Sequence, residues 1–423
     1  TKARRFADSL IDGVGPEAGS FEISKANLNR VLSEDELVLA YDVTETGILI
    51  YSIRRSGIVD CRYKPISRKA LEALVRNYME KVSFENGADK TTKFNKLIKF
   101  DRNLGMHLYN LLLGHAVTKG LLRDGTRLTI VPDDFLGVVP FEMLVVGERP
   151  APKMQMGWAA VSLCEFLGDR WQVSYYQSVT DLLISRCADQ KASTERKLLV
   201  VADPVYSSGD QLHCKDSQTR GTGGTDADKA PGTLQWPRLA PTKQLADDLK
   251  RAYPGQADVL DGFAATKGEF LAKIKRQKYQ DVVFAIHGYV GDALPEPALV
   301  LGMSKDGDGP HYLGMSEIIR LRLNTDTVVL AACHTGTGEV LPGEGVLAMG
   351  RAFRYAGART VLTSSWSMDV TSTVQLVTSF YANLRNGKTK RDALRIARKE
   401  LRRDPHYDHP FFWAGLILAG EGD

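Results

Sequence analysis

The chain has 423 residues, of which 43% are hydrophobic and 25% charged, the composition of an ordinary globular protein of more than one domain. Its 55 basic and 51 acidic residues leave a net charge of +4, too small to indicate a nucleic-acid partner, and we expect no direct contact with nucleic acid. The five cysteines are scattered without a CxxC pair, which argues against a disulfide framework or a zinc site and favours a reducing, cytoplasmic location with no cofactor.

The first 195 residues predict a lead segment followed by a small α/β lobe. Residues 1–35 carry several glycines and one short helix, and they lack the features of a signal peptide. The chain does not begin with Met, so we expect residue 1 to be an internal position of a longer polypeptide. We expect no membrane association, since no apolar run has the length of a membrane span. Over 36–195, apolar periodicity predicts strands at 37–42, 47–53, 57–61, 127–131 and 173–176, and helices at 67–82, 104–117 and 178–187.

Residues 196–423 predict a second and larger α/β unit. Its first strand leads into a stretch, 207–232, that is rich in Gly, Ser, Asp and Thr, which we interpret as a flexible lid or activation loop. The glycines there lack the Gly-Lys-Ser/Thr ending of a phosphate-binding loop. Beyond it, strands and helices alternate, as expected of a mostly parallel sheet covered on both faces. The expected strands are 197–203, 257–260, 281–286, 298–301, 326–332, 359–364 and 411–419, and the helices are 242–252, 266–277, 315–322, 345–355, 370–384 and 389–401.

Two of these strands end in reactive residues, His287 and Cys333. In parallel sheets the chemistry sits beyond the carboxyl ends of the strands, so the two side chains can meet as a thiolate nucleophile and its acid/base partner. The backbone N–H groups of Gly288 and Cys333 are the candidate donors to an oxyanion. The alternative is that Cys333 is a small buried residue and His287 a hydrogen-bonded core histidine. His334 is a competing base, but its side chain is expected to point to the opposite side from its neighbour Cys333.

Several separated motifs follow one another in a fixed order along the chain. They are Phe284-Ala-Ile-His-Gly288, Ala331-Ala-Cys-His-Thr-Gly336, Gly343-Glu-Gly345, Ala352-Phe-Arg-Tyr-Ala-Gly-Ala358, Ser365-Trp366 with Asp369, and His409-Pro-Phe-Phe-Trp413. Further upstream, Pro132-Asp-Asp134 and Pro140-Phe-Glu-Met-Leu144 fit the same series. In this order the motifs resemble the CHAT family, bacterial relatives of caspases and separase, and the resemblance covers most of residues 36–420.

The resemblance implies a caspase-like, mostly parallel sheet flanked by helices. It implies an inactive, pseudo-protease lobe over 36–195 and an active peptidase domain over 196–423. It also implies a regulated cysteine endopeptidase that cuts specific protein substrates, with His287 as general acid/base and Cys333 as nucleophile. An upstream TPR or sensor module, or an activating complex, is the implied partner, and bacterial defence, in some cases CRISPR-linked, is the implied setting.

The resemblance further places four residues around the substrate cleft: Glu344, Ser365, Trp366 and Asp369. An acid near the tryptophan receives a basic P1 residue in separase-like enzymes, which makes Asp369 the candidate S1 residue. The alternative for Asp369 is the N-cap of the helix that begins at Val370.

Two wider alternatives stay open. The chain can be a catalytically silent scaffold or protein-binding module that keeps the fold. The Arg- and Lys-rich region 385–403 is best explained as a solvated helix face, with a docking surface for an acidic partner or RNA as the alternative.

Overall fold

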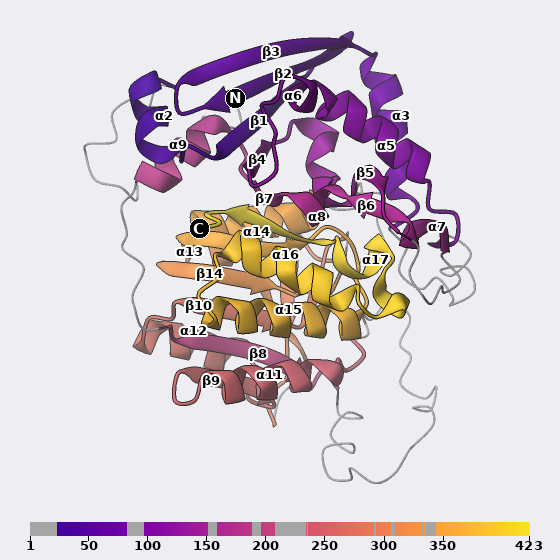
Figure 1. Ribbon diagram of the computed structural model, residues 1–423. Coiled ribbons are helices and arrows are strands. Elements are labelled where there is room, and N and C mark those ends of the chain that lie inside the picture. Colours follow the sequence, from indigo (N-terminus) through magenta and orange to yellow (C-terminus); the bar gives the residue numbers. More distant parts are fainter. Residues whose placement is uncertain are drawn as a thin grey trace.

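The computed structural model describes residues 23–82, 97–150, 159–187, 196–207, 234, 236–291, 293–305, 309–331, 333–334 and 344–423, and for 159–160, 333–334 and 344–347 it describes the backbone alone. One eleven-stranded sheet runs through both predicted units (Figure 1). In spatial order its strands are β3 (Gly57–Pro65), β2 (Gly47–Arg54), β1 (Glu36–Val43), β4 (Arg127–Val131), β7 (Gln172–Tyr175), β17 (Leu416–Gly420), β16 (Ala358–Ser364), β14 (Thr325–Leu330), β10 (Asp281–Ala285), β8 (Leu198–Pro204) and β9 (Ala257–Gly262).

Most neighbours in this sheet are parallel, as the apolar runs of β8, β10 and β14 predict. These three strands are buried along their whole length, which is typical of strands covered on both faces. Antiparallel pairing joins β1 to β2, β2 to β3, and β16 to β17. The predicted mostly parallel sheet is therefore confirmed.

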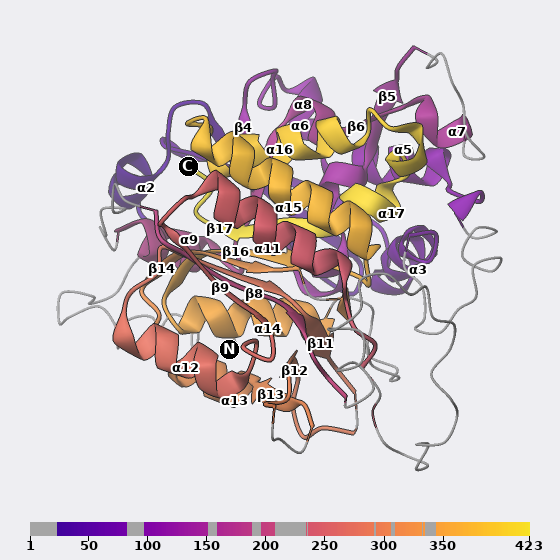
Figure 2. The ribbon, with the colours of Figure 1, turned by 90° about the horizontal axis from the view of Figure 1, so that it is seen from below.

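Helices cover both faces of the sheet (Figure 2). One face packs against α11 (Pro241–Ala252), α15 (Val370–Arg385) and α16 (Lys390–Leu401), and in the first lobe against α3 (Arg68–Met79) and α5 (Arg102–Leu112). The other face packs against α12 (Lys267–Arg276), α13 (Met315–Arg320) and α14 (Glu344–Tyr355), and in the first lobe against α2 (Lys25–Val31) and α9 (Val179–Cys187). The remaining α-helices among the described residues are the short α6 (Gly114–Thr118), α7 (Ala159–Ser162), α8 (Leu167–Arg170) and α17 (Pro410–Trp413).

Two smaller sheets complete the described strands. Beyond the ends of β10 and β14 lies a four-stranded sheet of β13 (His311–Gly314), β12 (Ala298–Leu301), β11 (His287–Tyr289) and β15 (Cys333–His334). A hairpin of β5 (Val145–Glu148) and β6 (Cys164–Phe166) belongs to the first lobe. The four-stranded sheet contains both of the predicted catalytic residues, His287 and Cys333.

The two lobes meet at β17, which lies between β16 of the second lobe and β7 of the first. A domain boundary near 195 therefore runs through a continuous sheet, and the division into an inactive and an active unit stays a prediction. The lead segment up to residue 22 and residues 208–232 of the predicted loop lie outside the described residues.

Buried ion pairs also join the lobes, and most of them involve α16. Arg391 contacts Glu36 of β1 at 2.9 Å, Arg398 contacts Glu142 at 2.9 Å, and both pairs are almost fully buried. Near the end of the helix, Arg402 contacts Asp169 at 2.6 Å. The expectation of a solvated basic face is wrong for these arginines, because the first lobe supplies carboxylates that take up their charge.

Glu36 is the centre of this network. It accepts hydrogen bonds from Arg391 (2.9 Å), Arg186 (2.7 and 2.9 Å) and Thr129 (2.6 Å). Burial acts to raise the pKa of the Glu36 carboxyl, but the charge of Arg391 and the hydrogen bonds of Arg186 hold that pKa well below its usual range. Glu36 is therefore an ionised carboxylate inside the protein.

Residues 411–419 were expected to form one strand, and this is wrong for their first part. His409 accepts a hydrogen bond from the N–H of Phe411 (3.1 Å) through its side chain, and the helix α17 begins at Pro410. Proline is favoured at the first position of a helix, because its missing N–H has no partner there in any case. The closing strand is confined to β17. Within the described part of the chain, no helix combines the length and apolar character needed to cross a membrane.

Candidate active site

His287 and Cys333 lie side by side in the four-stranded sheet. β10 and β14 are parallel neighbours, and beyond their ends the chain continues into β11 and β15, which also pair in parallel. In that pairing His287 is in register with Cys333, and Gly288 with His334. Neighbouring strands are about 4.8 Å apart, so the backbones of the two reactive residues are adjacent. The side chains of Cys333 and His334 lie outside the described part of the structure.

The His287 ring is held by a backbone carbonyl. The side chain is only 3% exposed, and Nε2 lies 2.7 Å from the carbonyl oxygen of Pro237. A carbonyl can only accept, so Nε2 carries the hydrogen and donates it, which leaves Nδ1 as the nitrogen with a lone pair. Among the described residues Nδ1 has no hydrogen-bond partner. The ring is therefore fixed in the tautomer in which Nδ1 is able to accept a proton.

Burial also sets the charge of His287. Removal from water lowers the pKa of the imidazole below its usual 6.5, and the hydrogen bond to Pro237 offsets this only in part. The ring is accordingly neutral at pH 7. A neutral imidazole with an open Nδ1 is suited to take a proton from a nucleophile.

Aromatic rings enclose this histidine. The centroids of Tyr206 and Trp236 lie 5.3 and 5.4 Å from the centroid of the His287 ring. The Tyr206 hydroxyl donates to the carbonyl of Val300 (3.2 Å) and accepts from the N–H of His287 (3.3 Å). Trp236 Nε1 donates to the Tyr312 hydroxyl (3.2 Å). Apolar rings on this scale limit the access of water and strengthen polar interactions inside the site.

Sequence reasoning did not identify Tyr206, Trp236 or Pro237. Tyr206 follows the end of β8, and Trp236 and Pro237 come just before α11. Their positions in the sequence could have pointed to the site. Both segments adjoin the carboxyl edge of the sheet, which is where ligands of α/β folds bind.

The structure places three of the four predicted substrate residues as follows. Asp369 caps α15 and accepts from the N–H of Ser372 at 2.8 Å, which is the alternative role foreseen for it. Trp366 is 2% exposed and donates from Nε1 to the carbonyl of Phe411 (3.1 Å), and Ser365 is fully buried. These two side chains pack within the interior. Glu344 begins α14, and its side chain lies outside the described part of the structure.

The chain is similar to a known protein family and to several known proteins. The model described as "CHAT domain" matches residues 102–421. Tetratricopeptide repeat protein 28 of Mus musculus is 34% identical over 108 residues, which is 26% of this chain and 4% of that protein. The Homo sapiens protein of the same name is 34% identical over 135 residues, 30% of this chain and 5% of that protein. The chain thus corresponds to a small fraction of the length of these relatives.

Among solved structures, the separase–securin complex of Saccharomyces cerevisiae matches with a TM-score of 0.54 and 10% identity, covering 98% of this chain and 32% of that chain. The Arg-specific cysteine proteinase gingipain R matches with a TM-score of 0.40 and 10% identity, covering 84% of this chain and 74% of that chain. At such low identity the separase match speaks for the fold alone. The family model spans more than half of the residues, and the chain belongs to the CHAT domain family.

Proposed function

We propose that this chain is a cysteine endopeptidase in which Cys333 is the nucleophile and His287 the general acid/base. The observation that carries the proposal is the parallel register that pairs His287 with Cys333. Side chains at paired positions of neighbouring strands share a face of the sheet, whereas the next residue along a strand faces the other way. This alternation favours His287 over His334 as the base.

The proposed reaction begins with proton transfer from the Cys333 thiol to Nδ1 of His287. The thiolate then attacks the scissile carbonyl carbon, a C–S bond forms, and the carbonyl electron pair moves onto the oxygen. The N–H groups of Gly288 and Cys333 are the proposed donors to that oxyanion. As the C–N bond breaks, His287 returns its proton to the leaving amine. Water, deprotonated by His287, then hydrolyses the thioester and restores the thiol.

The hydrogen bond from His287 to the carbonyl of Pro237 supports the uptake and the return of the proton by His287. It orients the ring through Nε2 and stabilises the imidazolium that forms when Nδ1 takes up the proton, since a carbonyl oxygen attracts a positively charged donor. Pro237 is a positioning residue in this scheme, because it acts on the reaction only through the imidazole.

We further propose that the peptidase is regulated, with an upstream TPR or sensor module as the controlling partner. The curated relatives bear the name of tetratricopeptide repeat proteins, and this chain matches only 4–5% of their length. The predicted role of loop 207–232 as a lid or activation segment belongs to the same proposal. Glu344, Ser365 and Trp366 stay predictions for the substrate cleft.

The test combines cleavage with thiol labelling. The purified chain, alone and with its upstream partner, is incubated with a peptide library and with a thiol-reactive peptidyl probe. Cys333→Ala and His287→Ala should each lower turnover by about 10⁴-fold or more, and probe labelling of Cys333 should require His287. Cys61→Ser is the matched control, because Cys61 is a free and exposed thiol outside the site. Equal cleavage by wild type and Cys333→Ala, or labelling spread over Cys61 and Cys214, would support the silent-scaffold alternative.

A further inference from the structure

The end of β8 carries a buried acid in a strained backbone conformation. Asp203 is 1% exposed and has a φ of 47°, in the left-handed region that residues with a Cβ rarely adopt. The register between β8 and β9 shifts between Ala202 and Pro204, so Asp203 occupies an irregularity of the sheet. Irregularities of this kind redirect a side chain, and they are common beside active sites. The strain indicates a use for the Asp203 side chain, and its contacts show what it holds.

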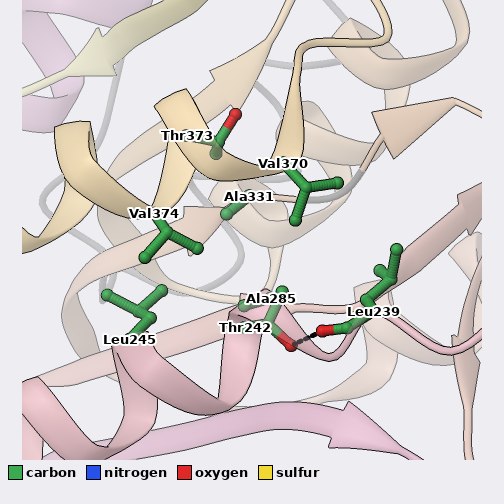
Figure 3. Close-up of a pocket in the computed structure, with 8 residues that line it drawn as sticks. All are labelled: Leu239, Thr242, Leu245, Ala285, Ala331, Val370, Thr373 and Val374. Carbon is green, nitrogen blue, oxygen red and sulfur yellow. Dashed lines mark hydrogen bonds between the residues drawn. The ribbon is translucent and has the colours of Figure 1, made fainter. Parts of the chain in front are cut away.

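Asp203 holds the segment that precedes α11 with both its side chain and its backbone. The carboxylate accepts from Nε and Nη2 of Arg238 at 2.8 and 2.7 Å, a bidentate geometry that orients the guanidinium group. The N–H of Asp203 donates to Thr242 Oγ1 at 2.8 Å. Thr242 in turn donates to the carbonyl of Leu239, also at 2.8 Å, and Figure 3 shows this bond. Asp203 thereby restrains the residues that directly follow Pro237.

Arg238 is joined to the carbonyl that orients His287. The Pro237 carbonyl and the Arg238 nitrogen belong to one planar peptide unit, so restraining residue 238 restrains the direction of that carbonyl. The carbonyl oxygen lies 2.7 Å from Nε2 of His287. Pro237 has no N–H of its own through which its backbone could be held. Residues 236–239 lie outside the helices and strands, so the contacts of Arg238 give this segment the support that a regular element would provide.

The end of β8 also supports the histidine from a second segment. Tyr206 lies three residues after Asp203, and its hydroxyl accepts from the N–H of His287 at 3.3 Å. The Tyr206 ring centroid lies 5.3 Å from the centroid of the imidazole, and the Trp236 centroid lies 5.4 Å from it. The ion pair of Asp203 with Arg238 therefore ties together the two segments that contact His287.

We propose that Asp203 and Arg238 are positioning residues of the peptidase. Their ion pair keeps the Pro237 carbonyl against Nε2 of His287, which keeps the ring proton on that nitrogen and leaves Nδ1 to receive the proton of the Cys333 thiol. The inference rests on the proposed function and adds how its general base is oriented. The alternative is an ion pair that stabilises the fold without any effect on the imidazole, and the experiment distinguishes the two.

Kinetics of single substitutions give the first test. Asp203→Asn and Arg238→Gln break the ion pair but keep a polar side chain, and Asn tolerates the left-handed conformation. Each should lower kcat about 10- to 100-fold on a peptide that the wild type cleaves and change KM less than about threefold, because the base is misoriented while substrate binding is kept. Arg238→Lys keeps the charge without the bidentate geometry and should give a smaller loss. Lys243→Gln is the matched control on α11, since Lys243 pairs with Asp261 at 2.7 Å in an exposed contact, and it should leave both constants unchanged.

Nitrogen NMR of the imidazoles reads the orientation without relying on activity. In the full chain with isotope-labelled histidine, the protonated and the unprotonated nitrogen of a neutral ring give separate signals. The signals that are missing from His287→Gln belong to this ring. At neutral pH the wild type should show a protonated Nε2 and an unprotonated Nδ1. Asp203→Asn and Arg238→Gln should move both signals toward the average of the two tautomers, and Lys243→Gln should not.

The outcomes separate this inference from the proposed function. Wild-type kcat and unmoved His287 signals in Asp203→Asn and Arg238→Gln overturn the inference and leave the peptidase intact. A loss of activity that only follows the loss of folded protein in urea unfolding, with His287 signals at the wild-type positions, also overturns it. Absence of any Cys333-dependent cleavage by the wild type, with and without the upstream partner, overturns the proposed function, and the imidazole signals then still decide whether the ion pair orients His287.

Discussion

Replacing Glu36 with Gln tests how strongly buried charges hold the two halves of the sheet together. The substitution keeps the shape of the side chain but removes its charge, so two buried guanidinium groups, Arg391 and Arg186, then face a neutral amide. Breaking a buried pair from one side costs about 3–5 kcal/mol. Arg186 keeps a second carboxylate, Glu421, at 3.0 Å, and we therefore expect a loss near the lower limit, about 3 kcal/mol.

The opposite substitution, Arg391→Met, should cost less. Glu36 then keeps Arg186 and Thr129 as partners, so no charge is left alone. One charge-assisted hydrogen bond is lost, worth about 1.5–3 kcal/mol. Part of this loss is offset, because Nε and Nη1 of Arg391 are buried without a hydrogen-bond partner among the described residues and Met removes them. We expect a net loss of about 1.5 kcal/mol.

Urea unfolding at pH 7, followed by tryptophan fluorescence and circular dichroism, measures both losses. Arg395→Met is the matched control on the same helix, since Arg395 pairs with Asp392 in a partly exposed (i, i+3) contact and should contribute less than about 1 kcal/mol. The reasoning is refuted if Arg391→Met costs as much as Glu36→Gln, or if neither differs from the control.

Three further predictions follow from single groups. Because burial lowers the pKa of His287, its Nδ1 stays unprotonated at neutral pH, and kcat/KM of the proposed reaction should fall only below about pH 6.5; an acid limb above pH 7 contradicts this. Burial lowers the pKa of His409 to about 3. Below about pH 6.5 the histidine is protonated in the unfolded chain, whereas in the folded chain it stays neutral down to about pH 3. The free energy of unfolding therefore decreases as the pH falls from about 6.5 to about 3. His409→Asn keeps an acceptor for the N–H of Phe411 without this titration, and urea unfolding at several pH values should show a smaller loss between pH 6.5 and 4, whereas an unchanged slope would rule the explanation out. Asp369→Ala should lower the free energy of unfolding by about 1 kcal/mol, because the N–H of Ser372 loses its acceptor, and Asp369→Asn by much less; equal losses would show that capping is not its role.

The parallel core could be predicted because its strands are apolar on both faces. The apolar runs that begin at Asp281 and Asp326 are short, uninterrupted and followed directly by polar or small residues. The sequence alone therefore predicts where each strand ends and which reactive residue follows it. The pairing of β10 with β14 then brought the two ends together. The prediction of neighbouring strand ends depended only on local pattern and on the order of elements.

The contacts of His287 could not be predicted in the same way. Its hydrogen-bond partner is a backbone carbonyl, that of Pro237, and every residue carries such a group. Tyr206 and Trp236 lie 81 and 51 positions earlier in the chain, and nothing in their neighbouring residues indicates that they meet the histidine. Contacts made by backbone atoms or across long sequence separations leave no periodic signal.

The burial of the arginines of α16 could not be predicted either, because it depends on residues far away in the sequence. Local pattern gives a helix rich in Arg, which is the pattern of a solvated face. The carboxylate that reverses this interpretation for Arg391 is Glu36, 355 positions away in the first lobe. Likewise, Phe411 and its apolar neighbours favour a strand by composition, and only the preceding His409-Pro410 pair indicates that a helix begins there.

The position of β17 has a consequence for how the protein reaches its folded state. This strand joins the two lobes, yet it is the last of the eleven strands of this sheet in sequence order. Until it is in place, β7 and β16 each present an unpaired edge, and open edges of this kind invite pairing with other chains. We therefore expect the nascent polypeptide to pass through a stage, ended only by residues 416–420, in which it is most prone to aggregate and most dependent on chaperones.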